Sequence, residues 1–344
     1  MRKENGKKVL VRVPNWIGDA VMCLPALEAL KRLFPSSTIT VLARPKVIPV
    51  FENNPAVSEI LEFGSKKGGI LEKLSISSEL KGRGFDTAVL FQNAFEAAFL
   101  SFLSRIPERV GYARDLRSAF LTRAVPVDRE IKKRHHVFYY LNLVEALGGP
   151  MEDEKEAPVP KLYISEEEAG WASEFLEKKG LPGRPLFGAA PGASYGPAKM
   201  WPPERFSSVL KELTEARKGA ALVFGGPDDK EACGALKRAY PHALDLSGAL
   251  NLRQSMALMS LLDAFITNDS GPMHISAALG VPTVAIFGST DSVLTGPVGE
   301  KTAVVGKKME CSPCFKRECK YGHYECLRAI EAGEVLKAAK GLLA

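Results

Sequence analysis

The sequence predicts an α/β protein made of two Rossmann-like domains, each a doubly wound parallel sheet. Three observations support this prediction. The chain has 344 residues, a length that favours two domains. Short β-branched runs alternate with helical patterns in both halves, which is typical of parallel sheets with crossover helices. Between the halves, residues 148–160 are rich in glycine, proline and acidic residues, as expected of a linker.

The expected domain boundaries follow from that linker composition. The N-terminal domain covers residues 1–150, the linker 151–160 and the C-terminal domain 161–344. The C-terminal domain is expected to contain a cysteine-rich loop over 309–328 and to end in a helix. In open α/β sheets ligands bind at the carboxyl ends of the strands, so two facing sheets predict a cleft between the domains.

Each element is predicted from its own pattern: strands from short apolar runs rich in β-branched residues, helices from apolar residues at helical spacing. In the first half the expected strands are 8–13, 38–43, 59–63 and 87–90, and the expected helices are 20–33, 94–103 and 137–147. In the second half the expected strands are 185–190, 220–224, 264–267 and 283–287, and the expected helices are 203–217, 229–239, 252–262 and 271–279.

The composition excludes a disordered chain, because 46% of the residues are hydrophobic and 25% are charged. The net charge is +6, and residues 105–134 hold nine Lys or Arg residues against four acids. Such a stretch favours an anionic partner, such as a phosphorylated molecule, a lipid headgroup or nucleic acid. A solvated surface is an equally good interpretation.

Neither secretion nor membrane insertion is predicted. Residues 1–8 are basic, but the apolar run 9–13 is shorter than the core of a signal peptide. No run approaches the roughly 18 apolar residues that a membrane span requires. The sequence therefore predicts a cytoplasmic protein.

The first motif with chemical potential follows the first strand. Residues 14–20 read PNWIGDA, which places Asp19 near a helix start after a glycine turn. Asp19 could cap this helix by accepting backbone N–H groups. The functional alternative is a general base at the carboxyl edge of the sheet.

A second motif, residues 191–202, reads PGASYGPAKMWP between a strand and a helix. Backbone amides of such a turn can cradle an anion, and Lys199 can add a positive charge. Neither the G-x-G-x-x-G nor the P-loop fingerprint is present. An ordinary turn with Trp201 packed in the core remains the alternative.

A third motif, residues 267–274, reads TNDSGPMH at the end of an apolar strand. The Ser270 hydroxyl and the Gly271 amide at the start of a helix suit a diphosphate. Asp269 could cap that helix or bind a sugar hydroxyl. His274 is as well explained by a place in the core as by a ligand role.

Two further groups need weighing. Asp228 and Asp229 follow a strand-end glycine turn, where an acid can bind ribose hydroxyls, although Asp228 could simply cap the next helix. The late cysteines fit a structural zinc site, a loop of free thiols, or disulfides formed on oxidation. These four cysteines are Cys311, Cys314, Cys319 and Cys326.

Taken together, the motifs resemble the lipopolysaccharide heptosyltransferases, and the resemblance runs through nearly the whole chain. The similar segments are WIGD at 16–19, IPERVGY at 106–112, GPAKMWP at 196–202 and TNDSGPMH at 267–274. The GPAKMWP segment is similar to the type II branch of the family rather than to type I.

This resemblance implies a GT-B fold with an acceptor-binding N-terminal domain and a donor-binding C-terminal domain. It implies an inverting, metal-independent transfer of heptose from ADP-heptose to a heptosyl residue of the lipopolysaccharide inner core, with no cofactor. The acceptor would be membrane-anchored, with peripheral membrane contact by the enzyme, and no nucleic-acid partner is expected.

The resemblance also assigns roles to residues. Asp19 would be the general base, Asp269 would hold the heptose, and Asp229, or else Asp228, the ribose. Arg109 and Arg117 would meet the acceptor. The remaining donor contacts would be diphosphate ligands: Ser194, Tyr195, Lys199, Ser270 and Gly271. The competing hypotheses are a related transferase with another nucleotide sugar, a non-catalytic nucleotide- or glycan-binding module, and a zinc or redox protein built on the cysteines.

Overall fold

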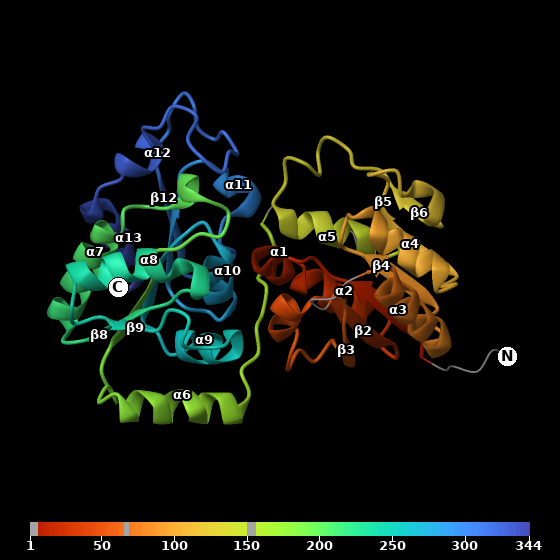
Figure 1. Cartoon of the computed structure of the whole chain (residues 1–344), viewed down its shortest axis with the longest axis horizontal. Coiled ribbons are helices and arrows are strands. Elements are labelled where there is room, and N and C mark those ends of the chain that lie inside the picture. Colours follow the sequence, from red (N-terminus) through yellow and green to blue (C-terminus); the bar gives the residue numbers. More distant parts are fainter. Residues whose placement is uncertain (1–5, 65–68, 150–155) are drawn as a thin grey trace. The chain divides into compact units, whose positions relative to one another are not determined.

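The structure is a computed structural model that describes residues 6–64, 69–149 and 156–344. The chain divides into two compact units, unit 1 (Met1–Tyr163) and unit 2 (Ile164–Ala344). The expected linker over 151–160 lies partly outside the described residues, and its described remainder has neither helix nor strand. Figure 1 shows a sheet flanked by helices in each unit.

Unit 1 contains a parallel sheet that is six-stranded within the described residues, in the order β3-β2-β1-β4-β5-β6. Its strands are β1 Lys8–Arg12, β2 Thr38–Ala43, β3 Glu59–Glu62, β4 Thr87–Leu90, β5 Glu108–Tyr112 and β6 Arg123–Val125. Its helices are α1 Ile17–Met22, α2 Leu24–Leu33, α3 Ile70–Arg83, α4 Phe95–Leu103 and α5 His136–Glu145, with short 3-10 turns η1 Pro45–Val50 and η2 Ser118–Phe120. Helices α1, α2 and α5 pack together, as do α3 and α4.

Unit 2 repeats this topology, because its order β12-β11-β10-β7-β8-β9 is the same arrangement read from the other edge. Its strands are β7 Leu186–Ala190, β8 Ala220–Val223, β9 Leu244–Asp245, β10 Ala264–Asn268, β11 Thr283–Phe287 and β12 Thr302–Gly306. Its helices are α6 Glu166–Lys178, α7 Pro203–Arg217, α8 Lys230–Ala239, α9 Leu252–Met259, α10 Gly271–Ala278, α11 Ser292–Thr295, α12 Glu325–Arg328 and α13 Ala332–Leu342, with 3-10 turns η3 Pro197–Lys199 and η4 Pro227–Asp229. This strand order is that of a doubly wound Rossmann sheet, so the predicted fold class is confirmed.

The order of strands defines where a ligand would bind in each sheet. In unit 1 the chain reverses direction across the sheet between β1 and β4, and in unit 2 between β7 and β10. Loops leaving neighbouring strands diverge at such a switch point, so their backbone and side chains can surround a ligand there. The segments that follow β1, β4, β7 and β10 are therefore the first places to look for a site.

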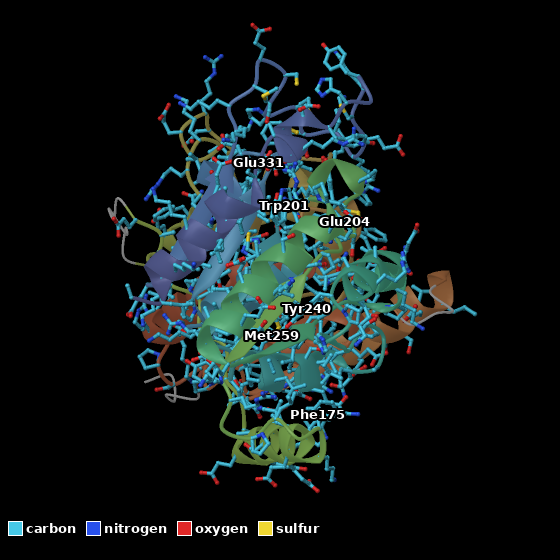
Figure 2. All side chains as sticks on the ribbon, turned by 90° about the vertical axis from the view of Figure 1, so that its left-hand side faces the viewer. Phe175, Trp201, Glu204, Tyr240, Met259 and Glu331 are labelled. Carbon is cyan, nitrogen blue, oxygen red and sulfur yellow. The ribbon has the colours of Figure 1, made fainter. Side chains whose placement is uncertain are left out.

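The core of unit 2 fixes the segments next to its switch point. Trp201, labelled in Figure 2, is fully buried and packs edge-on against Phe206 with ring centroids 5.0 Å apart. Its indole N–H donates to the Ile330 carbonyl at 3.0 Å. Truncating such a buried aromatic typically costs about 3–5 kcal/mol. The turn that ends at Trp201 is therefore anchored in the core.

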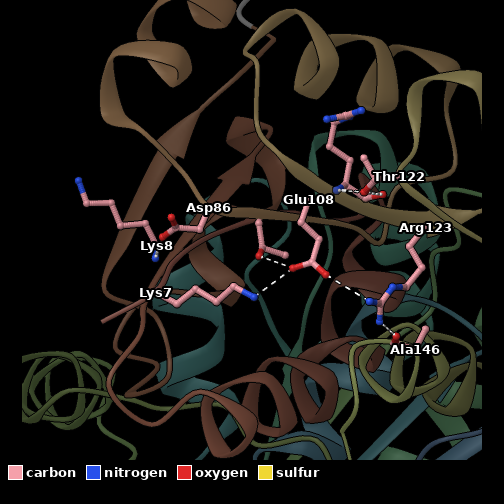
Figure 3. Close-up of polar contacts among 9 residues, drawn as sticks. Lys7, Lys8, Asp86, Glu108, Thr122, Arg123 and Ala146 are labelled. Carbon is pink, nitrogen blue, oxygen red and sulfur yellow. Dashed lines mark hydrogen bonds and ion pairs between the residues drawn. The ribbon is translucent and has the colours of Figure 1, made fainter. Parts of the chain in front are cut away.

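The amino-terminal ends of the strands in unit 1 are joined by a polar network around Glu108 (Figure 3). Its carboxylate accepts from Lys7 at 3.0 Å and from Thr87 at 2.8 Å, and Arg123 lies 3.5 Å away. Burial raises the pKa of Glu108, but the hydrogen bonds from Lys7 and Thr87 outweigh it, so the net pKa is lowered. This network lies opposite the carboxyl ends of the strands and stabilises the sheet.

Within the described residues, no helix is long and apolar enough to cross a membrane.

Candidate functional site

The switch point of unit 2 is held together by Asn268, the last residue of β10. Asn268 is fully buried, and its amide nitrogen donates to the Pro191 carbonyl at 2.7 Å. Its side-chain oxygen accepts from the Trp201 backbone N–H at 3.0 Å. One amide thus fixes both ends of the turn after β7. Asn268 was not predicted as a site residue, although a polar residue at the end of an apolar strand indicates such a position.

Lys199 and Asp269 meet at this edge of the sheet. The Lys199 ammonium lies 2.5 Å from an Asp269 carboxylate oxygen, with only 13% and 5% of the two side chains exposed. The same oxygen accepts from the Thr290 hydroxyl at 2.5 Å. Two residues expected to touch the donor are therefore direct neighbours. Thr290 was missed, although its place in a polar turn after β11 could have indicated it.

The start of α10 lies directly after Asp269. Ser270 is the N-cap residue, and its side chain makes no capping hydrogen bond to the helix. Its hydroxyl lies 3.3 Å from that of Thr267. Helix N-termini carry partial positive charge and attract anions, so Ser270 and Gly271 are suited to a phosphate group. His274 is buried in the same helix, with 6% exposure, as expected for a core histidine.

The turn after β7 carries two further predicted contacts. Ser194 is exposed, whereas Tyr195 is half-buried and its hydroxyl donates to the Phe315 carbonyl at 2.8 Å. The Lys199 ammonium lies over the Tyr195 ring, 4.7 Å from its centroid. Tyr195 therefore contacts Lys199 through the face of its ring, while its hydroxyl is already hydrogen-bonded to Phe315.

Asp229 ties together two turns of unit 2. Its carboxylate accepts from the Gly226 backbone N–H at 2.8 Å. A side chain at Gly192 would come within 2.0 Å of the Asp229 carboxylate, so only glycine permits this approach. Asp229, and not Asp228, is the N-cap residue of α8, which corrects the alternative that Asp228 caps this helix. Asp228 is exposed on the short turn η4.

In unit 1, Asp19 lies in the first turn of α1. The N-cap residue of α1 is Trp16, so the alternative interpretation of Asp19 as the N-cap residue is wrong. Asp19 is half-buried, and one carboxylate oxygen accepts from the Tyr140 hydroxyl at 3.0 Å. Burial and the Asp19 charge raise the pKa of Tyr140 well above its ordinary value, so this hydroxyl remains a donor near neutral pH.

His136, at the start of α5, is a second titratable group in the electrostatic field of Asp19. Burial lowers the pKa of His136, and the negative charge of Asp19 opposes this shift. The net direction is downward, so the imidazole is largely neutral at pH 7. Neither Tyr140 nor His136 was identified from the sequence. The helical pattern predicted at 137–147 explained Tyr140 as an ordinary helix residue, and His136 lies just before that predicted helix.

The two arginines expected at the acceptor are occupied by contacts within unit 1. Arg117 is fully buried and donates to the Tyr112 carbonyl at 2.9 Å and the Gln92 carbonyl at 2.5 Å. Burial lowers the pKa of Arg117 to about 10, so it stays charged at pH 7. Arg109 donates to the Phe120 carbonyl at 2.6 Å. These contacts favour a structural role for both guanidinium groups.

The late cysteines are free thiols in the structure. Cys326 is buried, whereas Cys311, Cys314 and Cys319 are half-buried. No group of three or more His, Cys, Asp or Glu residues is arranged to hold a metal ion in the part of the chain that the structure describes. The structural zinc site, the loop of free thiols and disulfides formed on oxidation all stay predictions for this segment.

Comparison with known proteins gives a consistent result. The family described as glycosyltransferase family 9 (heptosyltransferase) matches residues 73–325. Lipopolysaccharide heptosyltransferase 2 of Salmonella typhimurium is 29% identical over 352 aligned residues, which cover 98% of both chains. Lipooligosaccharide heptosyltransferase 2 of Haemophilus ducreyi is 30% identical, with 98% of this chain and 99% of the relative covered.

Two solved structures extend this similarity to the fold. The ADP-heptose lps heptosyltransferase II of E. coli superimposes with a TM-score of 0.83 at 26% identity, covering 98% of each chain. The glycosyl transferase family 9 protein of Veillonella parvula gives a TM-score of 0.88 at 28% identity, covering 98% of this chain and 97% of the other. Since the family match spans well over half of the sequence, the chain is a glycosyltransferase that belongs to glycosyltransferase family 9, the heptosyltransferase family.

Proposed function

We propose that the protein transfers heptose from ADP-heptose to a heptosyl residue of the lipopolysaccharide inner core, with inversion at the anomeric carbon and without a catalytic metal. The observation that carries this proposal is the Lys199–Asp269 pair beside the start of α10, at the switch point of unit 2. The donor and acceptor are suggested by the names of the relatives, which include an ADP-heptose lps heptosyltransferase II. Unit 2 would then bind the donor and unit 1 the acceptor.

The donor contacts would divide by chemistry. Lys199, with Ser270 and Gly271 at the helix start, supplies positive charge for the diphosphate. Ser194 would donate its exposed hydroxyl to the diphosphate. Tyr195 would contribute by holding the Lys199 ammonium over its ring. Asp269 would accept a heptose hydroxyl, because its carboxylate faces the same cluster. Asp229, or else Asp228, would accept from the ribose.

Asp19 would act as the general base. The acceptor hydroxyl is a poor nucleophile near pH 7, and a carboxylate can remove its proton as the new bond forms. The bond between the acceptor oxygen and the anomeric carbon forms while the bond from that carbon to the diphosphate oxygen breaks. ADP leaves with the electron pair, and attack from the opposite side inverts the anomeric centre. Tyr140 would hold Asp19 in place for this step.

The diphosphate gains negative charge as ADP leaves. Charges fixed in advance stabilise a transition state because they need no reorganisation during the reaction. Lys199 is fixed by Asp269 and by the Tyr195 ring, and Asp269 is in turn fixed by Thr290. These protein groups support the proposal that no metal ion is needed to bring about departure of ADP.

The basic stretch over 105–134 supports an anionic, membrane-anchored acceptor and peripheral contact with the membrane from the cytoplasmic side. Arg105, Arg114 and Arg123 are exposed, and Leu116 is 93% exposed among them. Exposed cations next to an apolar side chain suit anionic lipid headgroups. Sedimentation with anionic vesicles at low and high salt measures this contact, and equal binding to neutral vesicles would contradict it. Arg109 and Arg117 would contribute by shaping this region from within.

A donor panel tests the proposed function most simply. ADP-heptose, ADP-glucose and UDP-sugars are offered with a mono-heptosylated inner-core acceptor in the presence of EDTA. Transfer from ADP-heptose alone is expected, and NMR of the product should show the inverted anomeric configuration. Preference for another nucleotide sugar would favour a related transferase, and donor binding without turnover would favour a non-catalytic binding module.

A further inference from the structure

The cysteine loop, residues 309–328, packs directly against the turn after β7. The Tyr195 hydroxyl donates to the Phe315 carbonyl at 2.8 Å, and the Ala198 backbone N–H donates to the Arg317 carbonyl at 3.0 Å. Gly196 makes this approach possible, because a side chain there would come within 2.6 Å of the Arg317 carbonyl oxygen. Its φ of 141° also favours glycine.

The loop is tied to the end of β11 as well. The backbone N–H groups of Cys314 and Phe315 both donate to the Ser289 carbonyl, at 3.0 Å and 2.7 Å. The Ser312 hydroxyl donates to the Gly288 carbonyl. Thr290, the residue after Ser289, donates its hydroxyl to the Asp269 carboxylate. The loop is therefore anchored both to the turn that carries Lys199 and to the strand end that orients its partner.

These contacts bring a second cation to the Tyr195 ring. The Arg317 guanidinium carbon lies 5.3 Å from the ring centroid, and the Lys199 ammonium lies 4.7 Å from the same centroid. Lys199 is already paired with Asp269 at 2.5 Å, which offsets much of its charge. Arg317 is exposed and forms no ion pair with the carboxylates in the described residues.

We propose that Arg317 is a second cation of the donor site and binds the diphosphate of the nucleotide sugar. This inference rests on the proposed function, since it places that diphosphate beside Lys199. A nucleoside diphosphate carries more negative charge than a lysine paired with an aspartate can balance. The guanidinium fork can donate two parallel hydrogen bonds to phosphate oxygens, which an ammonium cannot do. The cysteine loop would thus complete the donor site.

The test compares Arg317→Ala and Arg317→Lys with Lys316→Ala, a matched control because Lys316 is an exposed cation next to Arg317 in the same loop. Calorimetry measures the Kd of each protein for ADP and for adenosine, which carries no phosphate, at one fixed ionic strength. We expect Arg317→Ala to weaken ADP binding about 10-fold or more and to leave adenosine unchanged. Arg317→Lys should fall between Arg317→Ala and the wild type. Lys316→Ala should stay within about twofold of the wild type, because a solvated charge outside a direct contact contributes little.

Three results would overturn the inference. An Arg317→Ala protein with wild-type affinity for ADP would remove Arg317 from the site. Equal losses for ADP and adenosine would indicate that Arg317 only supports the loop, and equal losses in Lys316→Ala would indicate a diffuse charge effect. Melting temperatures of all variants confirm that folded proteins are compared. If the wild-type protein itself failed to bind ADP, the proposed function would fail first.

Discussion

At the residue scale, substitution of Tyr140 tests the proposed role of Asp19 as the general base. Its hydroxyl donates to the Asp19 carboxylate at 3.0 Å. A donor to the ionised form lowers the pKa of a carboxylate, so Tyr140→Phe should raise the pKa of Asp19. We expect turnover to fall about tenfold, and the acidic limb of the rate profile to move to higher pH, while donor KM stays constant.

The control for this change is Tyr240→Phe, which removes a hydroxyl bonded to Thr214 within unit 2 at 2.8 Å. It should cost similar stability without moving the pH profile. A Tyr140→Phe enzyme with an unshifted acidic limb would contradict the proposed contact between Tyr140 and the catalytic base.

A second single-residue substitution, at Lys199, tests the proposed donor site. Lys199→Met keeps most of the apolar stem but removes the ammonium, and it leaves the Asp269 carboxylate facing an incoming diphosphate. A charge-assisted hydrogen bond contributes about 1.5–3 kcal/mol, so ADP should bind about 10- to 100-fold more weakly. Titration calorimetry measures this, with the exposed Lys211→Ala on α7 as a control. Unchanged ADP affinity in folded Lys199→Met would remove Lys199 from the diphosphate.

At the scale of elements, an ion pair between α6 and α9 ties α6 into unit 2. Arg253 donates to Glu168 at 2.6 Å, and this hydrogen bond lowers the pKa of Glu168. A carboxylate whose folded pKa lies below its unfolded value stabilises the fold above the unfolded pKa, and this contribution is lost as pH falls through the folded pKa. Glu168→Gln should therefore lower the free energy of unfolding by about 1–3 kcal/mol at pH 7.

This difference should shrink as the pH falls below about 4.5, the ordinary pKa of a glutamate. Glutamine can replace the glutamate in the capping box with Ser165, so the capping of α6 is largely retained. Glu174→Gln is the control on the same helix, because its pair with Lys178 is exposed and should contribute about 0.5 kcal/mol or less. A Glu168→Gln deficit that is constant from pH 3 to 7 would contradict the assignment.

The elements also show what the sequence could and could not predict. Strands β2, β4 and β11 match their predicted bounds, because each is a short β-branched run buried in the sheet. The predicted helix at 20–33 is two helices that meet at Cys23. Pro25 lacks the backbone N–H that would continue the helical hydrogen bonds from α1. The helix was predicted from the spacing of its apolar residues, and this spacing is the same whether or not the helix is broken.

The strands that were missed are mostly at or near sheet edges. β6, β9 and β12 are edge strands, and β6 and β12 are largely unburied, with burial patterns eeB and iieie. Edge strands need few apolar residues, so their sequences carry little periodic signal. β5 was missed for another reason: Glu108 and Arg109 at its start resemble a polar loop, but Glu108 is satisfied by Lys7 and Thr87.

At the scale of the whole molecule, the chain repeats one doubly wound topology in two units. The alternation of strands and helices predicted this, since each crossover must return the chain to a parallel neighbour. The candidate site was predicted less completely. Motifs at strand ends identified Asp19, Lys199 and Asp269, but partners that come from distant segments, such as Tyr140 and Thr290, depend on tertiary contacts that a single sequence does not reveal.

The central claim, that this glycosyltransferase uses Asp19 as the base for heptosyl transfer, is tested most directly by Asp19→Asn. Asparagine keeps the shape of the side chain but cannot accept the proton. Single-turnover transfer of heptose from ADP-heptose to the mono-heptosylated acceptor is measured beside ADP affinity and melting temperature. The rate should fall by about 100-fold or more, with ADP affinity and melting temperature unchanged. A folded Asp19→Asn enzyme that transfers heptose at nearly the wild-type rate would contradict the claim.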